Sequence, residues 1–234
     1  MFKNKTKKQE YSKYVSELGK VCKIAFGKGL IDTHSGNISM GIKENILITK
    51  AGKSLIDLKP SDFTIVPLNP GKQSGKVSNP FKSAETSEPS SELEVHKFIL
   101  KSFKDSTVFH SHPVNAIALS LVLDKKKTDK FKSSPLIIKK LHTEYPGLNK
   151  ITPADFESAY FFPEIYIMPL KFIEDIKSGG LKLKLEAKDI FKENGVFIIK
   201  SHGSFSWGPT PLEALRWTLA LEASSEIILK SLSF

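Results

Sequence analysis

The spacing of apolar and polar residues divides the chain into short strands and amphipathic helices. Apolar positions recur at helical spacing in some segments, which predicts helices, and form short runs bounded by turn residues in others, which predicts strands. Helices are predicted for residues 10–28, 115–123, 181–194 and 212–232, and for a segment that follows the cap-type residues 87–92 and ends near 103. Strands are predicted for residues 46–49, 62–69, 106–110, 164–169, 195–200 and 204–207, with one more at the end of the turn-rich stretch 32–40.

The order of these elements indicates one α/β domain. Several strands follow one another without a helix between them, which favours an α/β/α layered fold with a mixed, largely antiparallel central sheet. We expect residues 1–10 to form a basic tail and residues 11–234 to form the domain. The stretch 70–88 is rich in Gly, Ser, Lys and Pro and is expected to be an exposed loop, and 125–132 a surface turn or helix flank. Residues 135–163 show no clear pattern.

The charge of the chain does not favour a nucleic-acid partner, although the chain is basic. The 234 residues carry a formal net charge of +10, but nearly all the basic residues are lysines and Arg216 is the only arginine. Nucleic-acid readers rely on arginine for bidentate contacts with bases and phosphates, so no nucleic-acid partner is expected. A lysine-rich solvated surface can still attract an anionic substrate.

The cellular compartment follows from what the sequence lacks. It has no apolar run long enough to cross a membrane, and no apolar segment of a secretory signal follows the charged N-terminus. The single cysteine, Cys22, excludes an intrachain disulfide. We therefore expect a cytoplasmic protein with no membrane partner. There is no glycine-rich loop of the Walker or dinucleotide type, so a nucleotide cofactor is not expected.

Candidate metal chemistry lies in three histidines at predicted strand ends. His110 and His112 are two residues apart, so on a strand their side chains point to the same face. His202 follows another strand in a similar context. Three neutral imidazoles can hold a catalytic divalent metal and leave one position for substrate. A single histidine at such a place more often hydrogen-bonds a backbone carbonyl, so these residues alone leave both interpretations open.

Residues near the predicted helix start add an acid and two possible anion sites. Glu92 stands where an acid commonly caps a helix, but beside a metal it could act as a general base. Ser90 and Ser91, with the free N–H groups of the helix start, could bind an anion. The turn at 35–37 could do so too, because its glycine lets the backbone approach a phosphate closely.

Five short segments together resemble the class II aldolase/adducin N-terminal family. They are SGNIS (35–39), ITKAG (48–52), PSSE (89–92), HSHP (110–113) and SHGSFSWG (201–208), and the resemblance covers Tyr11 to Leu232. It implies one divalent metal per chain, most commonly zinc, held by His110, His112 and His202. It implies that Glu92 is the catalytic acid–base residue. It places the substrate phosphate in a pocket formed by Asn37, Gly52, Ser90 and Ser91.

The resemblance also implies an activity. A metal-dependent aldolase of this family would cleave a ketose 1-phosphate, similar to fuculose 1-phosphate, into dihydroxyacetone phosphate and an aldehyde. The retro-aldol step forms an enediolate that the metal stabilises. The active sites of the family commonly lie between subunits of a tetramer, so a homotetramer is expected.

Three other functions share this framework. Methylthioribulose-1-phosphate dehydratases have the same metal triad and a nearby glutamate. Ribulose-phosphate 4-epimerases share the retro-aldol step, but they usually carry Asp in place of Glu92 and use a C-terminal tail. Adducin uses the fold as a non-enzymatic module without the metal ligands, whereas all three histidines and the acid are present here.

The chain departs from the family pattern at three places. Ala51 stands where a threonine often precedes the glycine of the phosphate loop. The sequence stops at Phe234, so we expect no counterpart of the C-terminal tail that supplies a tyrosine or histidine in some members. The tyrosine proton donor is not clearly placed, although Asp155, Glu157 and Tyr160 lie in the right region.

Two further histidines are not assigned to the candidate site. His34 precedes the turn at 35–37 and is expected on the surface. His96, one helical turn after Glu92, is expected on a polar flank or at a subunit contact.

Overall fold

The computed structural model describes residues 2–69, 88–122, 139–140, 149–151, 153, 155–161, 164–178 and 186–231. Its strands are β1 (Asn37–Ile42), β2 (Asn45–Thr49), β3 (Phe63–Pro67), β4 (Thr107–Ser111), β5 (Lys139–Lys140), β6 (Asn149–Ile151), β7 (Ile165–Met168), β8 (Gly195–Ile199) and β9 (Gly203–Gly208). Its α-helices are α1 (Phe2–Gly27), α2 (Leu93–Ser102), α3 (Val114–Val122), α4 (Phe156–Phe161), α5 (Leu170–Lys177), α6 (Ala187–Ile190) and α7 (Pro211–Ser231). A short 3₁₀ turn, η1 (Pro60–Asp62), leads into β3.

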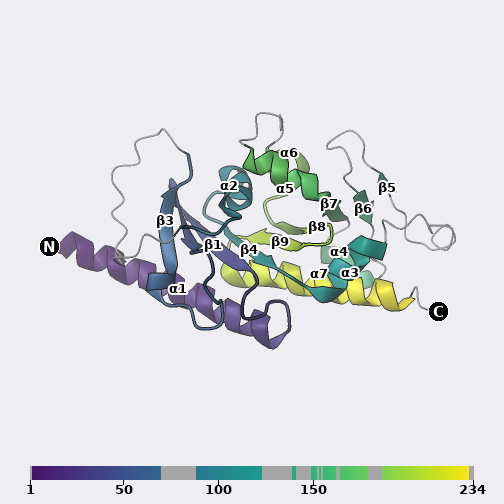
Figure 1. The fold of residues 1–234 in the computed structure, drawn as a ribbon, viewed down its shortest axis with the longest axis horizontal. Coiled ribbons are helices and arrows are strands. Elements are labelled where there is room, and N and C mark those ends of the chain that lie inside the picture. Colours follow the sequence, from purple (N-terminus) through teal and green to yellow (C-terminus); the bar gives the residue numbers. More distant parts are fainter. Residues whose placement is uncertain are drawn as a thin grey trace.

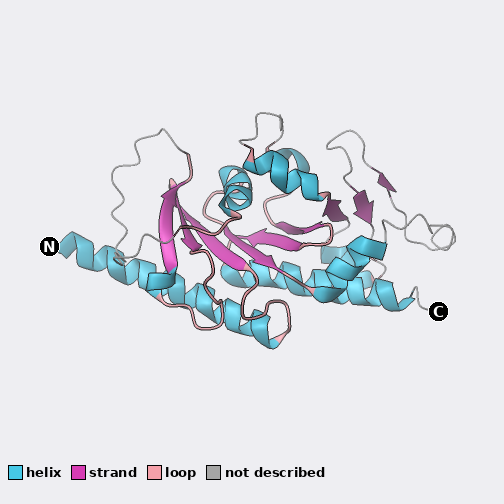
Figure 2. Ribbon diagram, viewed as in Figure 1, coloured by secondary structure: helices cyan, strands magenta, loops and turns pink. Residues whose placement is uncertain are grey.

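The described strands form one nine-stranded sheet with helices on both faces (Figures 1 and 2). The strand order is β3-β2-β1-β4-β9-β8-β7-β6-β5. All neighbouring pairs are antiparallel except β7 and β8, which are parallel. Helices α2, α5 and α6 cover one face, and α1, α3 and α7 cover the other (Figure 1). The predicted α/β/α fold with a mixed, largely antiparallel sheet is therefore confirmed.

The central strands are buried on both faces, which explains their continuous apolar runs. On β4, Val108 packs into the apolar cluster beneath α2 and the next residue, Phe109, packs into the cluster beneath α1 and α7. The same alternation holds on β8, where Phe197 faces α5 and α6 and Ile198 faces α3 and α7. Because side chains alternate along a strand, His110 lies on the same face as Val108, toward α2.

Two helices differ from the expectation. The predicted helix over 181–194 is wrong at its C-terminal end, because the described helix α6 (Ala187–Ile190) ends at Ile190, whereas residues 181–185 lie outside the part of the chain that the structure describes. It ends where Phe191 turns to an extended conformation and stacks on Phe197 of β8, with ring centroids 5.0 Å apart. Helix α5 was not predicted. It begins directly after β7 and buries Phe172, Ile173 and Ile176 on one side.

The N-terminal helix begins earlier than expected, and some elements lie where no pattern was recognised. Helix α1 begins at Phe2, so it includes residues that we expected in a tail before the domain. Strands β5 and β6 and helix α4 fall in the stretch that had no clear pattern. Residues 70–87 of the predicted loop at 70–88, and the lysine-rich stretch 125–132, lie outside the described residues. Among the helices that the structure describes, none is both long and apolar enough to cross a membrane.

Candidate active site

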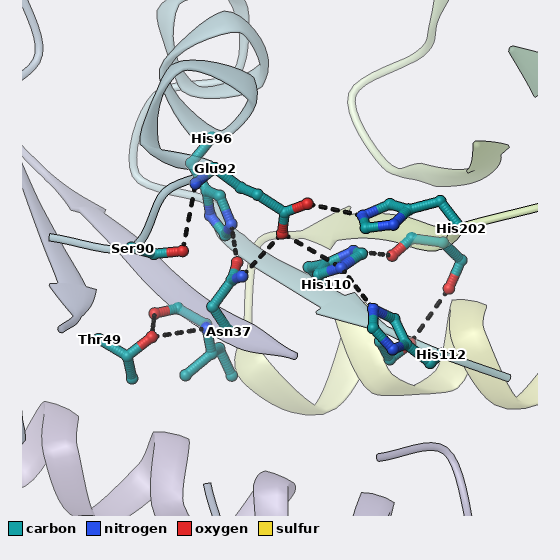
Figure 3. Close-up of polar contacts among 11 residues, drawn as sticks. Asn37, Thr49, Ser90, Glu92, His96, His110, His112 and His202 are labelled. Carbon is teal, nitrogen blue, oxygen red and sulfur yellow. Dashed lines mark hydrogen bonds and ion pairs between the residues drawn. The ribbon is translucent and has the colours of Figure 1, made fainter. Parts of the chain in front are cut away.

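Four segments that are distant in sequence meet at one end of the central strands (Figure 3). Asn37 begins β1, and Glu92 stands immediately before α2. His110 lies on β4, and His112 follows that strand by one residue. His202 lies in the turn between β8 and β9. Because β4 lies between β1 and β9, the sheet order itself brings these side chains together.

The three predicted ligand histidines converge. One ring nitrogen from each of His110, His112 and His202 lies within 4.8 Å of the others, an arrangement that could hold a metal ion. The Nε2 atoms of His110 and His112 are 3.0 Å apart. The rings of His110 and His202 are stacked, with centroids 4.9 Å apart. His110 is buried, whereas His112 and His202 are partly exposed, so the triad is closed on one side and accessible on the other.

The protonation of these histidines suits metal binding. His110 donates its Nδ1–H to the carbonyl oxygen of Ser204 at 2.9 Å, which leaves a lone pair on Nε2. Burial lowers the pKa of His110 to about 3, and burial also lowers the pKa of His112. Both rings are therefore neutral at pH 7, the form in which imidazole binds a metal. Neutral Nε2 atoms that point at one another form a donor set that fits a divalent cation.

Glu92 faces the histidines rather than the helix backbone. It occupies the N-cap position of α2, but its side chain makes no capping hydrogen bond, so the capping interpretation is wrong. One carboxylate oxygen, Oε1, accepts a hydrogen bond from Nε2 of His202 at 2.7 Å. The other, Oε2, lies 3.1 Å from Nε2 of His110 and accepts a hydrogen bond from the amide of Asn37 at 2.8 Å. The acid is thus part of the histidine cluster.

The surroundings of Glu92 keep it ionised. Burial raises the pKa of this carboxyl, but the hydrogen bonds from His202 and Asn37 outweigh burial. The pKa of Glu92 is therefore held well below its usual range. A buried carboxylate beside imidazoles can accept a proton or contact a cation.

His96 belongs to the site, which the sequence analysis missed. The expectation of a polar flank or subunit contact is wrong, because His96 is fully buried and hydrogen-bonds both Asn37 and Ser39. Its ring also meets the ring of Phe205 edge-on, with centroids 5.8 Å apart. The available signal was its position four residues after Glu92, which places both side chains on the same face of a helix.

Gly203 allows His110 and His112 to approach the β8–β9 turn. A Cβ atom at this position would lie 2.5 Å from the carbonyl oxygen of Ser111 and 2.7 Å from Cδ2 of His112. It would also lie 3.1 Å from Cε1 of His110. These contacts are with backbone and packed rings, so a side chain at 203 would displace the histidines.

The residues assigned to the phosphate lie on three adjoining segments. Asn37 and Ser90 are buried, and Ser90 Oγ accepts the N–H of Glu92 at 3.3 Å. Gly52, with a φ of +69°, and Ser91 are exposed. The segment of Gly52 pairs with that of the serines, because Ala51 donates to the Glu88 carbonyl at 3.0 Å and Ser90 donates to the Thr49 carbonyl at 3.1 Å. Phosphate binding by these residues stays a prediction.

The three proton-donor candidates lie on or beside α4. Tyr160 is 80% exposed and Glu157 is exposed, whereas Asp155 is half-buried and accepts the N–H of Ser158 at 2.8 Å. Helix α4 packs against α7. These positions give no reason to assign the donor role to any one of the three.

Comparison with known proteins places this site in a family. The family model of the class II aldolase and adducin N-terminal domain matches residues 16–229. An L-fuculose phosphate aldolase of Methanococcus maripaludis is 25% identical over 215 residues, which cover 91% of this chain and 94% of that relative. A methylthioribulose-1-phosphate dehydratase of Bacillus subtilis is 24% identical over 191 residues, which cover 80% of this chain and 78% of that relative.

Solved structures agree at the level of the fold. The crystal structure of L-fuculose-1-phosphate aldolase from Thermus thermophilus has a TM-score of 0.62 at 23% identity and covers 93% of each chain. That of a sugar-phosphate aldolase from Thermotoga maritima also has a TM-score of 0.62, at 21% identity, and covers 94% of this chain and 95% of that one. The resemblance first detected in five short segments is therefore confirmed over most of the chain, which belongs to the family of class II aldolase and adducin N-terminal domains.

Proposed function

We propose that the protein is a divalent-metal-dependent aldolase. Its substrate would be a ketose 1-phosphate similar to fuculose 1-phosphate, cleaved to dihydroxyacetone phosphate and an aldehyde. The observation that carries the proposal is the position of Glu92, whose carboxylate lies 2.7 Å from His202 and 3.1 Å from His110 inside the histidine cluster. An acid–base group and a metal-ligand set within contact of each other are what this reaction needs.

A divalent ion held by His110, His112 and His202, with zinc as the first candidate, would supply a Lewis acid for the substrate carbonyl. The chain itself supplies the proton transfers. When the C3–C4 bond breaks, the C4 hydroxyl loses its proton to give the aldehyde, and the bonding electron pair moves toward the C2 carbonyl. A proton must then be added to C3 to complete the ketone. Glu92 is an ionised carboxylate at the cluster, so it can accept one proton and return one.

The surrounding residues support binding of a phosphorylated substrate. Asn37, Gly52, Ser90 and Ser91 lie on segments that adjoin Glu92, and they offer amide, backbone and hydroxyl donors for a phosphate. The partly exposed His112 and His202 mark the side from which a substrate can approach. The net charge of +10 favours an anionic substrate over a neutral one.

The same residues suit a second reaction. The relatives include both an aldolase and a dehydratase at nearly equal identity, 25% and 24%. A methylthioribulose-1-phosphate dehydratase would use the same acid–base group to remove water instead of breaking a carbon–carbon bond. We therefore keep dehydration as the second candidate and design the test to separate the two.

The test compares two substrates on the metal-loaded protein. Fuculose 1-phosphate and methylthioribulose 1-phosphate are each incubated with the enzyme, and the products are followed by phosphorus NMR and mass spectrometry. The aldolase proposal expects dihydroxyacetone phosphate and an aldehyde from the first compound. A product of the second compound that keeps every carbon and has lost one water would establish the dehydratase instead. Consumption of neither compound would contradict both activities. A His202→Ala preparation, purified in the same way, controls for contaminating enzymes.

Assembly and location are part of the same proposal. We propose a homotetramer, in keeping with the family resemblance, and a place in the cytoplasm, where a buried thiol such as Cys22 stays reduced. Light scattering of the purified protein tests the tetramer directly.

A further inference from the structure

Behind Glu92 runs a chain of three buried hydrogen-bonding side chains, Asn37, His96 and Ser39, that is not itself part of the metal-ligand set. Figure 3 shows the first two of them beside Glu92. Ser39 Oγ lies 2.7 Å from Nδ1 of His96. Nε2 of His96 hydrogen-bonds Oδ1 of Asn37. The amide nitrogen of Asn37 then donates to Oε2 of Glu92 at 2.8 Å. Ser39 and His96 are fully buried and Asn37 is 9% exposed, so water does not replace these contacts easily.

The amide of Asn37 fixes the direction of the hydrogen bonds in the chain. Its NH₂ group donates to Oε2 of Glu92, which accepts, and its carbonyl oxygen faces Nε2 of His96. The carbonyl oxygen also only accepts, so Nε2 of His96 must carry the proton. The remaining nitrogen, Nδ1, then carries no proton, and its lone pair accepts a hydrogen bond from the hydroxyl of Ser39. The burial of His96, which lowers its pKa to about 4, keeps the ring in this neutral form.

His96 therefore determines which end of the Asn37 amide faces the acid. Without a donor at His96, the amide could rotate by half a turn and present its oxygen to the carboxylate of Glu92. Two acceptors in contact would repel each other, and Glu92 would lose one of the bonds that hold it beside His110 and His202. The aromatic ring of Phe205 lies against both His96 and His110, which leaves His96 little room for another orientation.

We propose that His96 is a positioning residue that, through Asn37, holds Glu92 in the orientation required for proton transfer. The inference rests on the proposed role of Glu92 and adds to it a specific neutral tautomer and a specific path. A displacement of about 1 Å in a catalytic group can lower a rate by about 10²-fold. Loss of the His96 donor should therefore lower kcat more than it raises KM.

Two substitutions of the same chemical type separate the two hydrogen bonds of His96. The amide of glutamine reaches about as far as Nε2 of histidine, so His96→Gln can still donate to Asn37. The amide of asparagine reaches only about as far as Nδ1, so His96→Asn keeps a partner for Ser39 and loses Asn37. We expect kcat to stay within about threefold in His96→Gln and to fall at least about tenfold in His96→Asn. Both variants should keep one metal ion per chain. Equal losses in the two variants would contradict a role that passes through Asn37.

A double-mutant cycle tests the path itself. If His96 acts through Asn37, the effect of His96→Asn should largely disappear in an Asn37→Ala background. Additive effects on kcat would overturn the proposal.

Nitrogen-15 NMR of the histidine rings provides a readout that needs no substrate. The proposal expects the neutral tautomer of His96 with the proton on Nε2, with and without the metal. A proton on Nδ1 would overturn it. Because this measurement is independent of turnover, it remains decisive if the protein acts on neither sugar phosphate, and a failure of the proposed function is then distinguishable from a failure of the positioning role.

Discussion

The backbone of Ser204 determines which ring nitrogen of His110 carries the proton. Its carbonyl oxygen, on β9, accepts the Nδ1–H of the imidazole on β4 at 2.9 Å, so Nε2 is left unprotonated and directed toward His112. This bond depends on strand pairing and not on the identity of a neighbouring side chain. The predicted metal ligand is thereby oriented by the sheet itself.

Replacement of this histidine should remove the metal. We expect about one divalent ion per chain in the purified wild-type protein and essentially none in His110→Ala, because two imidazoles alone bind a divalent ion much more weakly. Elemental analysis after extensive dialysis measures this. The exposed His34 provides the matched control, and His34→Ala should keep the ion. Equal metal content in the two variants would contradict the ligand assignment.

Glu92 should be required for turnover but not for metal content. Glu92→Gln keeps the shape of the side chain and removes its ability to take up a proton. We expect kcat to fall by about 10²-fold or more, which is the usual effect of losing an acid–base group. Steady-state kinetics and elemental analysis of the same sample check both parts. Full turnover in this variant would exclude the proposed role.

A methyl group at Gly203 should disturb the histidine cluster. The added Cβ would contact the Ser111 carbonyl at 2.5 Å and the ring of His112 at 2.7 Å. We expect Gly203→Ala to lower the free energy of unfolding by about 1–3 kcal/mol, as overpacking commonly does, and to weaken metal binding. Thermal unfolding and metal titration provide the measurements. Gly27 at the end of α1 has open space around it, so Gly27→Ala is the control that should leave metal affinity unchanged.

Glu222 on α7 should stabilise the start of α3. Its carboxylate accepts hydrogen bonds from the N–H groups of Asn115 and Ala116, both at 3.0 Å, and from the Asn115 side chain at 2.9 Å. We expect Glu222→Ala to cost about 1–2 kcal/mol in urea unfolding, the range for a lost helix cap. Glu226→Ala removes only an exposed ion pair with Lys230 on the same helix and should cost less than about 0.5 kcal/mol. Equal costs would contradict the capping role.

The buried His96 should make stability depend on pH below neutrality. Its pKa is lowered from 6.5 to about 4 by burial, so between these values the unfolded chain binds a proton that the folded protein does not. Stability from this group is fully present above pH 6.5 and is lost as the pH falls toward 4, by at most about 3 kcal/mol. Denaturant unfolding from pH 7 to pH 4 should give a steeper decline for wild type than for His96→Gln. Parallel curves would show that His96 does not titrate in this way.

The sequence was sufficient for the layered fold and for the three histidines that the structure brings together. The apolar runs of the central strands and the HSHP and SHG segments are local signals. In the structure the runs before these segments form the buried strands β4 and β8, and the histidines lie at or just beyond the ends of those strands. Glu92 was also identified, although its local signal pointed equally to helix capping. Only the sheet order, which brings His202 next to the start of α2, shows that the carboxylate faces the histidines and not the helix backbone.

What the sequence could not reveal depends on contacts between distant segments. His96 has the local surroundings of an ordinary helix residue, and only its partners Ser39 and Asn37, more than 50 residues earlier in the chain, define its role. Helix α6 ends earlier than predicted because Phe191 stacks on β8 instead of continuing the helix. Such tertiary packing overrides local periodicity.

The place of β4 between β1 and β9 has a consequence for synthesis of the chain. The strands β1 to β4 are made first, and one edge of β4 has no partner until β9 has left the ribosome. That edge belongs to an apolar strand, and unpaired apolar edges promote aggregation. Truncated chains that stop before Gly195 should therefore collect in inclusion bodies, and folding of the nascent protein depends on prompt arrival of its last two strands.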